Sequence, residues 1–214
     1  MKDGTAGAAV EGLSARQAAR RQRILDAALS LLELRDYERI AVRDVTEFAS
    51  VALATLYHYF PSKEHLFAEA LVQWASSLKA SVITRPLTGT TPGRRLEEAL
   101  LRSVRAFERQ PQLARLIGRL EMSEEPFARD VLARLDAVTT DVYLDLLTDL
   151  PRDQAVRIVR IVDAVLDSSL RAWSSGRSSI RDVRRSLSET VALLLPEASQ
   201  GDAGASRRFR ALPA

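Results

Sequence analysis

The sequence AVRDVTEFASVALATLYHYFPSK, residues 41–63, decides the architecture of this chain. It predicts two short helices, at about 42–49 and 53–60, that are separated by a three-residue turn and followed by Pro61. Two short helices joined in this way are typical of a helix-turn-helix, whose second helix lies in the major groove of DNA. We therefore predict a DNA-binding element here.

Helical spacing separates the two faces of this element. The apolar residues expected to pack its helices together are Val45, Ala49, Val51 and Leu56. Tyr59 and Phe60 are expected to turn into the core, since the helix directs them inward. The residues left free to meet DNA are Ala52, Leu53, Thr55, Tyr57 and His58.

Outside this element the chain is predicted to be all-α, with roughly nine helices and almost no strand signals. The first helix, at about 14–34, carries an apolar stripe with a period of 3.6 residues. Pro126 and Pro151 are placed to open two long helices, and Gly176 to cap the second. The other expected helices span about 63–84, 94–109, 112–120, 152–175 and 180–195, with a loop at 86–93.

These helices divide the chain into an expected order of domains. Residues 1–13 and 198–214 are Gly- and Ala-rich or polar and are predicted to be disordered. Residues 14–62 form the predicted three-helix DNA-binding domain. Residues 63–197 form a predicted helical bundle for ligand binding and dimerisation.

Composition excludes several classes of protein. The 214 residues are 46% hydrophobic and 28% charged, as in ordinary globular proteins. The absence of cysteine excludes disulfides, thiol catalysis and cysteine-ligated metals. A polar N-terminus and the lack of an apolar run near about 20 residues predict a cytoplasmic protein with no membrane contact. The net charge of +3 permits nucleic-acid binding without requiring it.

The segment Thr55-Leu56-Tyr57-His58-Tyr59-Phe60-Pro61-Ser62-Lys63-Glu64 resembles the recognition-helix signature of the TetR family of transcriptional repressors. The resemblance is strong over about residues 16–75. It implies a dimeric, one-component repressor with a helical sensor domain. The resemblance implies that Tyr57 and His58 contact phosphates and thymine methyls, and that Thr55 contacts a base edge or a phosphate. It also implies that Lys63 clamps a phosphate and that Arg43 contacts a base.

Two features of the DNA-binding element leave alternatives open. The arginines Arg16, Arg20, Arg21 and Arg23 form a basic arm suited to the minor groove, or are only a solvated face. Ser50 replaces the usual glycine of the turn, and is tolerable if its backbone avoids the left-handed region. Ala52 and Leu53 cannot hydrogen-bond to bases, so readout should depend on other residues and on DNA shape. His65 is expected to be an exposed residue without a role.

The second half carries no recognisable catalytic constellation and no cofactor motif, so we expect neither an enzyme nor a bound cofactor or metal. Its bulky apolar residues are core residues or line a ligand pocket between helices. The candidates are Trp74, Leu78, Phe107, Leu116, Met122, Phe127, Leu135, Tyr143 and Trp173. Asp163, Asp167, Ser168 and Ser169 share one helix with apolar residues, and any buried one needs a polar partner, either ligand or side chain.

The last two helices would pair with their copies in a second subunit, as the resemblance implies. Candidate interface residues are Ile158, Ile161, Val165, Val183, Leu187, Val191 and Leu194, with Val162 at the same spacing. A two-fold dimer implies a palindromic operator on double-stranded DNA.

Within the family, residues 51–57 and scattered positions such as Trp173 and Arg177 are similar to the actinobacterial repressors of steroid catabolism, the KstR type. That resemblance implies a large, apolar, acyl-CoA-like effector. Two other hypotheses stay open: an interaction module whose helix-turn-helix no longer reads DNA, and a helical enzyme acting on acyl-CoA compounds.

Overall fold

The computed structural model describes residues 13–84 and 86–196, and all regular structure in these two ranges is helical. The predicted all-α class is therefore confirmed. The predicted disordered segments lie outside these ranges, apart from Leu13. The helices are α1 (Ala15–Leu34), the 3-10 turn η1 (Tyr37–Arg39), α2 (Val42–Ala49), α3 (Leu53–Tyr59), α4 (Lys63–Thr84), α5 (Pro92–Arg109), α6 (Pro111–Glu121), α7 (Pro126–Asp145), α8 (Arg152–Ser174) and α9 (Ile180–Leu194).

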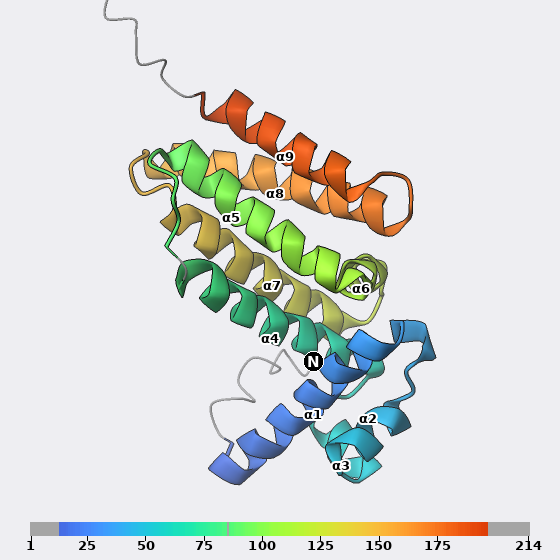
Figure 1. Cartoon of the computed structure of the whole chain (residues 1–214). Coiled ribbons are helices and arrows are strands. Elements are labelled where there is room, and N and C mark those ends of the chain that lie inside the picture. Colours follow the sequence, from blue (N-terminus) through green and yellow to red (C-terminus); the bar gives the residue numbers. More distant parts are fainter. Residues whose placement is uncertain (1–12, 85, 197–214) are drawn as a thin grey trace, which may run out of the picture.

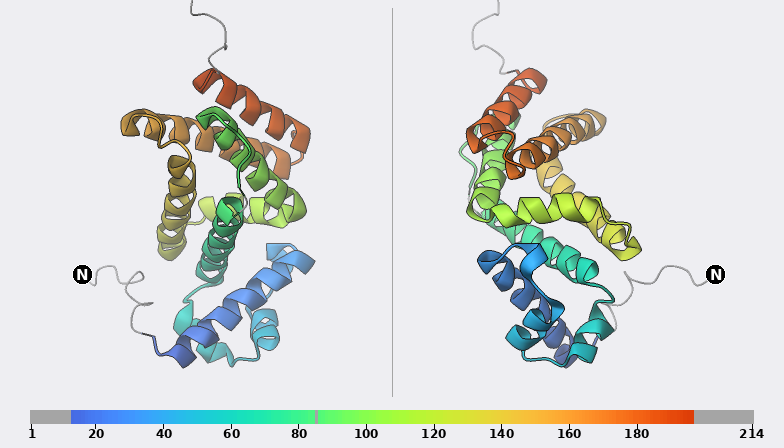
Figure 2. Two further views of the ribbon diagram at one scale, coloured as in Figure 1. Left: turned by 60° about the vertical axis from the view of Figure 1, so that its left-hand side comes forward. Right: turned by 90° about the vertical axis from the view of Figure 1, so that its right-hand side faces the viewer.

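The helices form two groups that are stacked end to end (Figures 1 and 2). Helices α1, α2 and α3 make one group, and α5 to α9 make the other. Helix α4 joins them, because it packs against both α1 and α7. Helices α8 and α9 form an outer pair, with α9 also against α5. The predicted boundary between residues 62 and 63 falls at the start of α4, and this division into domains stays a prediction.

Helix α1 begins with a capping box, in which Ser14 Oγ accepts from the Gln17 amide and the Gln17 side chain accepts from the Ser14 amide. Its predicted apolar stripe is confirmed as a buried face. That face contains Ile24, Leu25, Ala27, Ala28, Leu31 and Leu32. Burial of large aliphatic side chains, at about 1.5–3 kcal/mol each, is what holds α2 and α3 onto α1.

The helix-turn-helix core matches the sequence pattern. Val45, Ala49 and Leu56 are buried, and Val51 packs against them. Phe60, just after α3, is fully buried, whereas Tyr59 is only partly buried. The apolar side chains in the range 41–60 therefore pack α1, α2 and α3 together and leave the other face of α3 at the surface.

Two helix starts differ from the expectation, and one short element was not expected. Helix α5 begins at Pro92, because the Thr91 side chain caps it and proline suits the first helical position, so the loop ends earlier than predicted. Helix α6 likewise begins at Pro111. The turn η1 was not predicted from the pattern, because three residues are too few to show a period. Among the described helices, none is long and apolar enough to cross a membrane.

The turn between α2 and α3 places Ser50 in the left-handed region, with φ 51° and ψ 51°. The condition under which Ser50 would be tolerated without strain, a backbone outside this region, is therefore not met. The reason is geometric: the Val51 amide donates back to the Thr46 carbonyl, and this helix-ending bond requires a left-handed residue just after the helix. Ser50 therefore carries strain that glycine would not.

We expect Ser50→Gly to raise the free energy of unfolding by about 0.5–1 kcal/mol. Relief of the left-handed strain contributes about 1–2 kcal/mol, and the greater freedom of unfolded glycine removes about 0.4–1 kcal/mol. Urea unfolding followed by circular dichroism measures the change. Ser50→Ala is the control, since it keeps the β-carbon and should stay near wild type. An equal gain for both variants would contradict the strain argument.

Candidate nucleic-acid interface and internal cavity

The outward face of α3 consists of residues that contribute nothing to the core. Ala52, Leu53 and His58 are exposed, and Tyr57 is 46% exposed although it is a large aromatic residue. Thr55 is half-buried on the same helix. These five predicted DNA-contact residues therefore lie together at the surface, available to a groove.

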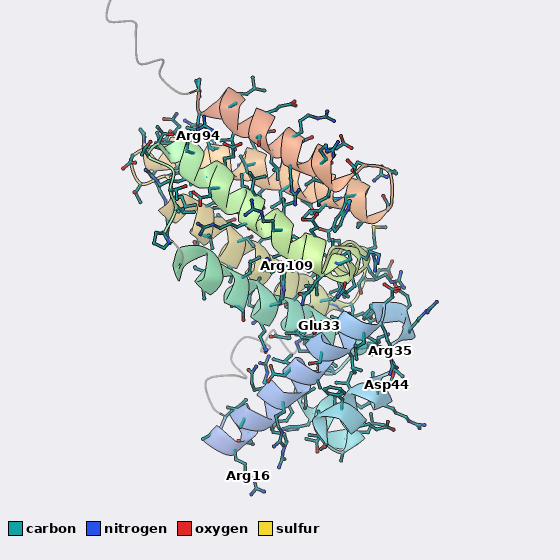
Figure 3. All side chains as sticks on the ribbon, viewed as in Figure 1. Arg16, Glu33, Arg35, Asp44, Arg94 and Arg109 are labelled. Atoms are coloured by element: carbon teal, nitrogen blue, oxygen red, sulfur yellow. The ribbon has the colours of Figure 1, made fainter. Side chains whose placement is uncertain are left out.

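The basic residues predicted to help them lie in different surroundings. Arg43, on α2, is exposed. Arg16 is exposed at the outer end of α1 and points away from the helical bundle (Figure 3). Arg20 is half-buried. Arg21 turns inward: its guanidinium donates to Glu69 Oε2 at 2.8 Å and lies 5.1 Å from the Phe60 ring centroid. In this structure Arg21 is thus a packing residue and not part of a free arm.

Lys63 is also engaged within the chain. Its Nζ donates to the Tyr37 carbonyl at 2.7 Å and lies 4.0 Å from the centroid of the Tyr37 ring. Burial lowers the pKa of Lys63. Ser62 Oγ accepts from the His65 amide, so one of the helix-start amides expected to be free is already used. The ammonium therefore ties η1 to α4 here and is not presented as an open phosphate clamp.

A buried carboxylate, Glu69 on α4, joins the two groups of helices. It accepts hydrogen bonds from Arg21 on α1 and from Arg134 on α7. His65 Nε2 lies 3.5 Å from Glu69 Oε1. Burial by itself raises the pKa of Glu69, but the hydrogen bonds from His65 and Arg134 and the charges of both arginines outweigh it and lower that pKa to about 2.

His65 was expected at the surface, and the structure shows it to be buried. Its ring stacks on Phe127 with centroids 5.3 Å apart, and it lies edge-on to Phe60. The first turn of α4 looks exposed in the sequence because the helix that covers it, α7, is more than 60 residues away. Phe127, a predicted pocket residue, is therefore a partner of His65 instead.

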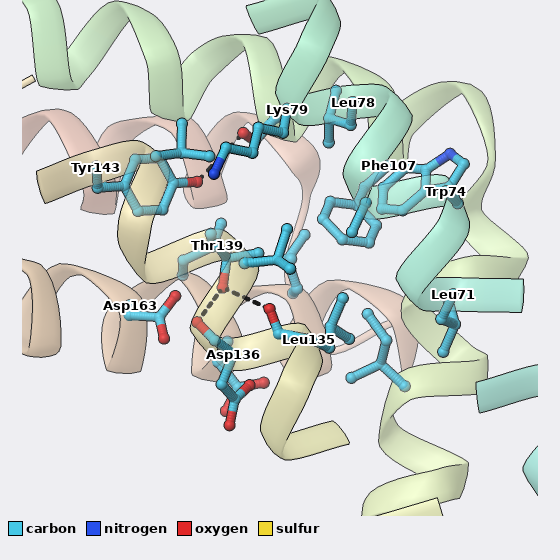
Figure 4. Close-up of a pocket in the computed structure, with 18 of the residues that line it drawn as sticks. Leu71, Trp74, Leu78, Lys79, Phe107, Leu135, Asp136, Thr139, Tyr143 and Asp163 are labelled. Atoms are coloured by element: carbon cyan, nitrogen blue, oxygen red, sulfur yellow. Dashed lines mark hydrogen bonds between the residues drawn. The ribbon is translucent and has the colours of Figure 1, made fainter. Parts of the chain in front are cut away.

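A cavity of about 400 Å³ lies between α4, α5, α6, α7 and α8 (Figure 4). Five predicted pocket residues line it: Trp74, Leu78, Phe107, Leu135 and Tyr143. The Trp74 and Phe107 rings are 4.9 Å apart. The Tyr143 hydroxyl donates to Ser103 Oγ at 3.2 Å. This size and apolar character suit a small-molecule site.

The other four pocket candidates lie elsewhere. Leu116 is buried in the core but does not line the cavity. Met122 is 81% exposed just after α6, and Phe127 stacks on His65. Trp173 packs against the core outside the cavity. Helical spacing selected all nine equally, because it does not say which neighbouring helix a side chain faces.

Sequence reasoning missed most of the polar wall of the cavity. This wall contains Lys79, Glu121, Asp136, Arg160, Asp163 and Asp167. The signal available was the presence of Asp163 and Asp167 one turn apart among apolar residues of α8. Asp136 and Glu121 gave no such signal, since each looks like a surface residue of its own helix.

The predicted interface residues divide into two sets. Ile158, Val162, Val183, Leu187 and Val191 are buried within the chain's own core, so the interpretation of these as interface surface is not supported. They pack α8 and α9 against each other and against α5. Ile161 is 46% exposed, and Val165 and Leu194 are half-buried. Leu193, which was not predicted, is 83% exposed.

Comparison with known proteins bears on both sites. Residues 24–70 match the family model described as "Bacterial regulatory proteins, tetR family", and residues 89–194 match "Tetracyclin repressor-like, C-terminal domain". The HTH-type transcriptional repressor KstR of Rhodococcus jostii is 35% identical over 185 residues, covering 86% of each chain. The chain belongs to the TetR family. KstR of Mycobacterium tuberculosis is 32% identical over 180 residues, covering 84% of this chain and 82% of the relative.

Solved structures of TetR-family members share the fold. A TetR transcriptional regulator from Rhodococcus sp. RHA1 superposes with a TM-score of 0.74 at 26% identity, covering 86% of this chain and 100% of that one. Thermus thermophilus FadR, solved in complex with lauroyl-CoA, gives a TM-score of 0.67 at 22% identity, covering 91% of this chain and 99% of that one. The helix-turn-helix and the bundle are thus the two parts of a TetR-family regulator.

We expect the Glu69 cluster to make stability depend on pH. The pKa of Glu69 is depressed in the folded state, so its contribution is complete above about pH 4.5 and is lost as the pH falls toward about 2. The depression corresponds to about 3 kcal/mol in the free energy of unfolding. Glu69→Gln should therefore destabilise the protein at pH 7 by an amount of this order.

Urea unfolding at several pH values between 3 and 6 measures this dependence. The slope of unfolding free energy against pH should be shallower in Glu69→Gln than in wild type. Glu47→Gln, at an exposed glutamate of α2, is the matched control and should keep the wild-type slope. The same slope in all three proteins would exclude this role for Glu69.

Proposed function

We propose that this protein is a ligand-released transcriptional repressor that binds a palindromic operator as a homodimer in the cytoplasm. The observation that carries the proposal is the outward face of α3. Leu53, Thr55, Tyr57 and His58 are held there by a helix-turn-helix core that is fully formed. Among the described residues, 13–84 and 86–196, this helix face packs against no part of the core.

The operator would be recognised through a small number of direct contacts and through the shape of the DNA. Arg43 is free at the surface to pair with a guanine edge. Tyr57 and Thr55 offer hydroxyl groups to phosphates or bases. Ala52 and Leu53 offer only van der Waals contacts, so positions beneath them would be read through DNA deformability. Lys63 would serve by its charge and by holding η1 in place.

Release would pass through helix α7. Leu135 and Asp136 line the cavity, and the preceding residue, Arg134, donates to Glu69. Glu69 in turn holds Arg21 on α1, the helix onto which α2 and α3 pack. An effector that binds more tightly when α7 is shifted would therefore weaken the contact that holds α1 in position. Coupling of about 1–3 kcal/mol is typical of such systems.

The effector is proposed to be a small molecule with an apolar body, because the aromatic and aliphatic part of the cavity wall favours one. The KstR relatives and the lauroyl-CoA complex of FadR make an acyl-CoA compound one candidate. The relatives are transcriptional regulators, and we propose no enzymatic activity for this chain.

Selection from random duplex DNA with the purified protein, at about 150 mM salt to suppress phosphate-only binding, tests the proposal. We expect an enriched palindrome. On that sequence Tyr57→Ala should lose about 1–3 kcal/mol of binding free energy, because it removes a groove contact without touching the core. Fluorescence anisotropy of labelled operator measures the loss.

Leu34→Ala is the control, since Leu34 is an exposed apolar residue at the far end of α1 and should bind like wild type. Normal binding by Tyr57→Ala would show that the recognition face is assigned incorrectly. Failure to enrich any sequence would favour the interaction-module hypothesis instead.

The exposed residues of the outer helix pair generate a separate prediction. Ile161 on α8 and Leu193 on α9 expose large apolar surfaces that a second subunit would cover. We expect Ile161→Asp/Leu193→Asp to sediment as a monomer and to bind the operator at least about tenfold more weakly, since each monomer reaches one half-site. Analytical ultracentrifugation measures the first effect. Leu34→Asp, which places a carboxylate on an exposed leucine elsewhere, should stay dimeric, and an unchanged double variant would place the interface on another face.

A further inference from the structure

The cavity has an acidic side whose charges are only partly balanced within the protein. Four carboxylates contribute to it, from α6, α7 and α8. Glu121 and Asp167 share Arg171, at 2.9 and 2.6 Å. Asp136 and Asp163 make no side-chain hydrogen bond or ion pair with any residue in the described part of the chain. The second pair is therefore available to a bound molecule.

Basic groups near the cavity do not cancel this acidic side. Lys79 on α4 and Arg160 on α8 also line the cavity, and neither forms an ion pair with Asp136 or Asp163. Even with Arg171 included, four carboxylates face three basic side chains. An anionic group that approached Asp136 and Asp163 would meet like charge in a partly desolvated site.

The surroundings of these carboxylates make their ionised forms costly. Burial, followed by the charges of Asp136 and Asp167, raises the pKa of Asp163 to about 6. Burial and the charge of Asp167 raise the pKa of Asp136. Burial, followed by the charge of Asp167, also raises the pKa of Glu121. A positive charge placed between them would remove this repulsion.

Another part of the cavity wall is apolar and partly aromatic. Trp74 and Phe107 lie on the opposite side from Asp136 and Asp163 (Figure 4). Leu71, Leu78 and Leu135 extend this apolar surface. A ligand that satisfies both walls must have an apolar body and a polar group of positive charge at one end.

We propose that the effector is an amphipathic amine, with its apolar body against Trp74 and Phe107 and its ammonium group between Asp136 and Asp163. This inference rests on the proposed function only in taking the cavity as the effector site. It differs from an acyl-CoA effector, whose charged groups are phosphates and whose acyl carbonyl cannot donate a hydrogen bond to a carboxylate.

Three ten-carbon probes that differ only in the head group test the assignment: decylamine, decanol and decanoate, each below its micelle-forming concentration. Trp74 and Trp173 are the only tryptophans, so the full-length Trp173→Phe protein reports on the cavity through Trp74 fluorescence. At pH 7.5 we expect decylamine to bind roughly tenfold or more tightly than decanoate, with decanol between them.

Replacement of the two aspartates tests the residues themselves. Asp136→Asn/Asp163→Asn should lose the preference for decylamine over decanoate while keeping its affinity for decanol, which shows that the cavity is intact. Asp130→Asn/Asp141→Asn removes the same charge from exposed positions of α7 outside the cavity and should keep the preference. A preference that survives in the first variant would overturn the assignment.

The affinity for decylamine should also rise between pH 5 and pH 7.5. Binding of a cation favours the ionised form of Asp163, whose pKa is about 6, so protonation removes this charge as the pH falls toward 5. The other charged groups at the cavity are Lys79 on α4, Glu121 on α6, and Arg160, Asp167 and Arg171 on α8.

Equal or tighter binding of decanoate, or binding of none of the three probes, would overturn the amine assignment. Those results leave the repressor proposal in place if the protein still selects a palindrome. Conversely, tight aspartate-dependent binding of decylamine by a protein that selects no DNA sequence would support the amine site and contradict the repressor proposal.

Discussion

The rest of the structure depends on the buried carboxylate of Glu69. A carboxylate removed from water costs several kcal/mol unless charged partners surround it, and here Arg21 comes from α1 and Arg134 from α7. If either arginine moved away, the buried carboxylate would lose a charged partner and the folded state would be destabilised. This holds α1 and α7 in one orientation on α4. The helix that supports the DNA-binding face and the helix that lines the cavity are thereby joined at one side chain.

Other contacts between the two groups of helices are weaker. Gln110 donates to Glu33 and Arg115 to Asp36, which ties the start of α6 to the end of α1 and to the residue before η1. These pairs are exposed, and exposed pairs contribute about 0–1 kcal/mol each. They can break and reform as α7 or α6 moves, whereas the Glu69 cluster, with the His65 ring stacked on Phe127, cannot do so without loss. A shift of α7 would therefore reach the DNA-binding face mainly through the Glu69 cluster.

The two functional surfaces are built on opposite principles. The face of α3 has few charges and relies on the shape of an exposed helix, with Tyr57 and Leu53 outward. The cavity places carboxylates such as Asp163 beside an apolar wall, where burial raises the pKa of that carboxyl to about 6. In both surfaces the functional residues lie outside the packed core. The outward residues of α3 are not part of it, and the aspartates lie at its border.

The sequence by itself determined the helix-turn-helix, the all-α class and the family, because these follow from local periodicity, from Ser14, Thr91 and Pro126 at helix starts, and from a contiguous motif at residues 55–64. Only the tertiary structure decided that Arg21 and Lys63 turn inward, that His65 is buried, and that Asp136 and Asp163 line the same cavity. The physical reason is distance along the chain. Periodicity shows that a helix has an apolar stripe, but which helix covers it, and which charges it brings, depends on packing between residues about 26 to 65 positions apart.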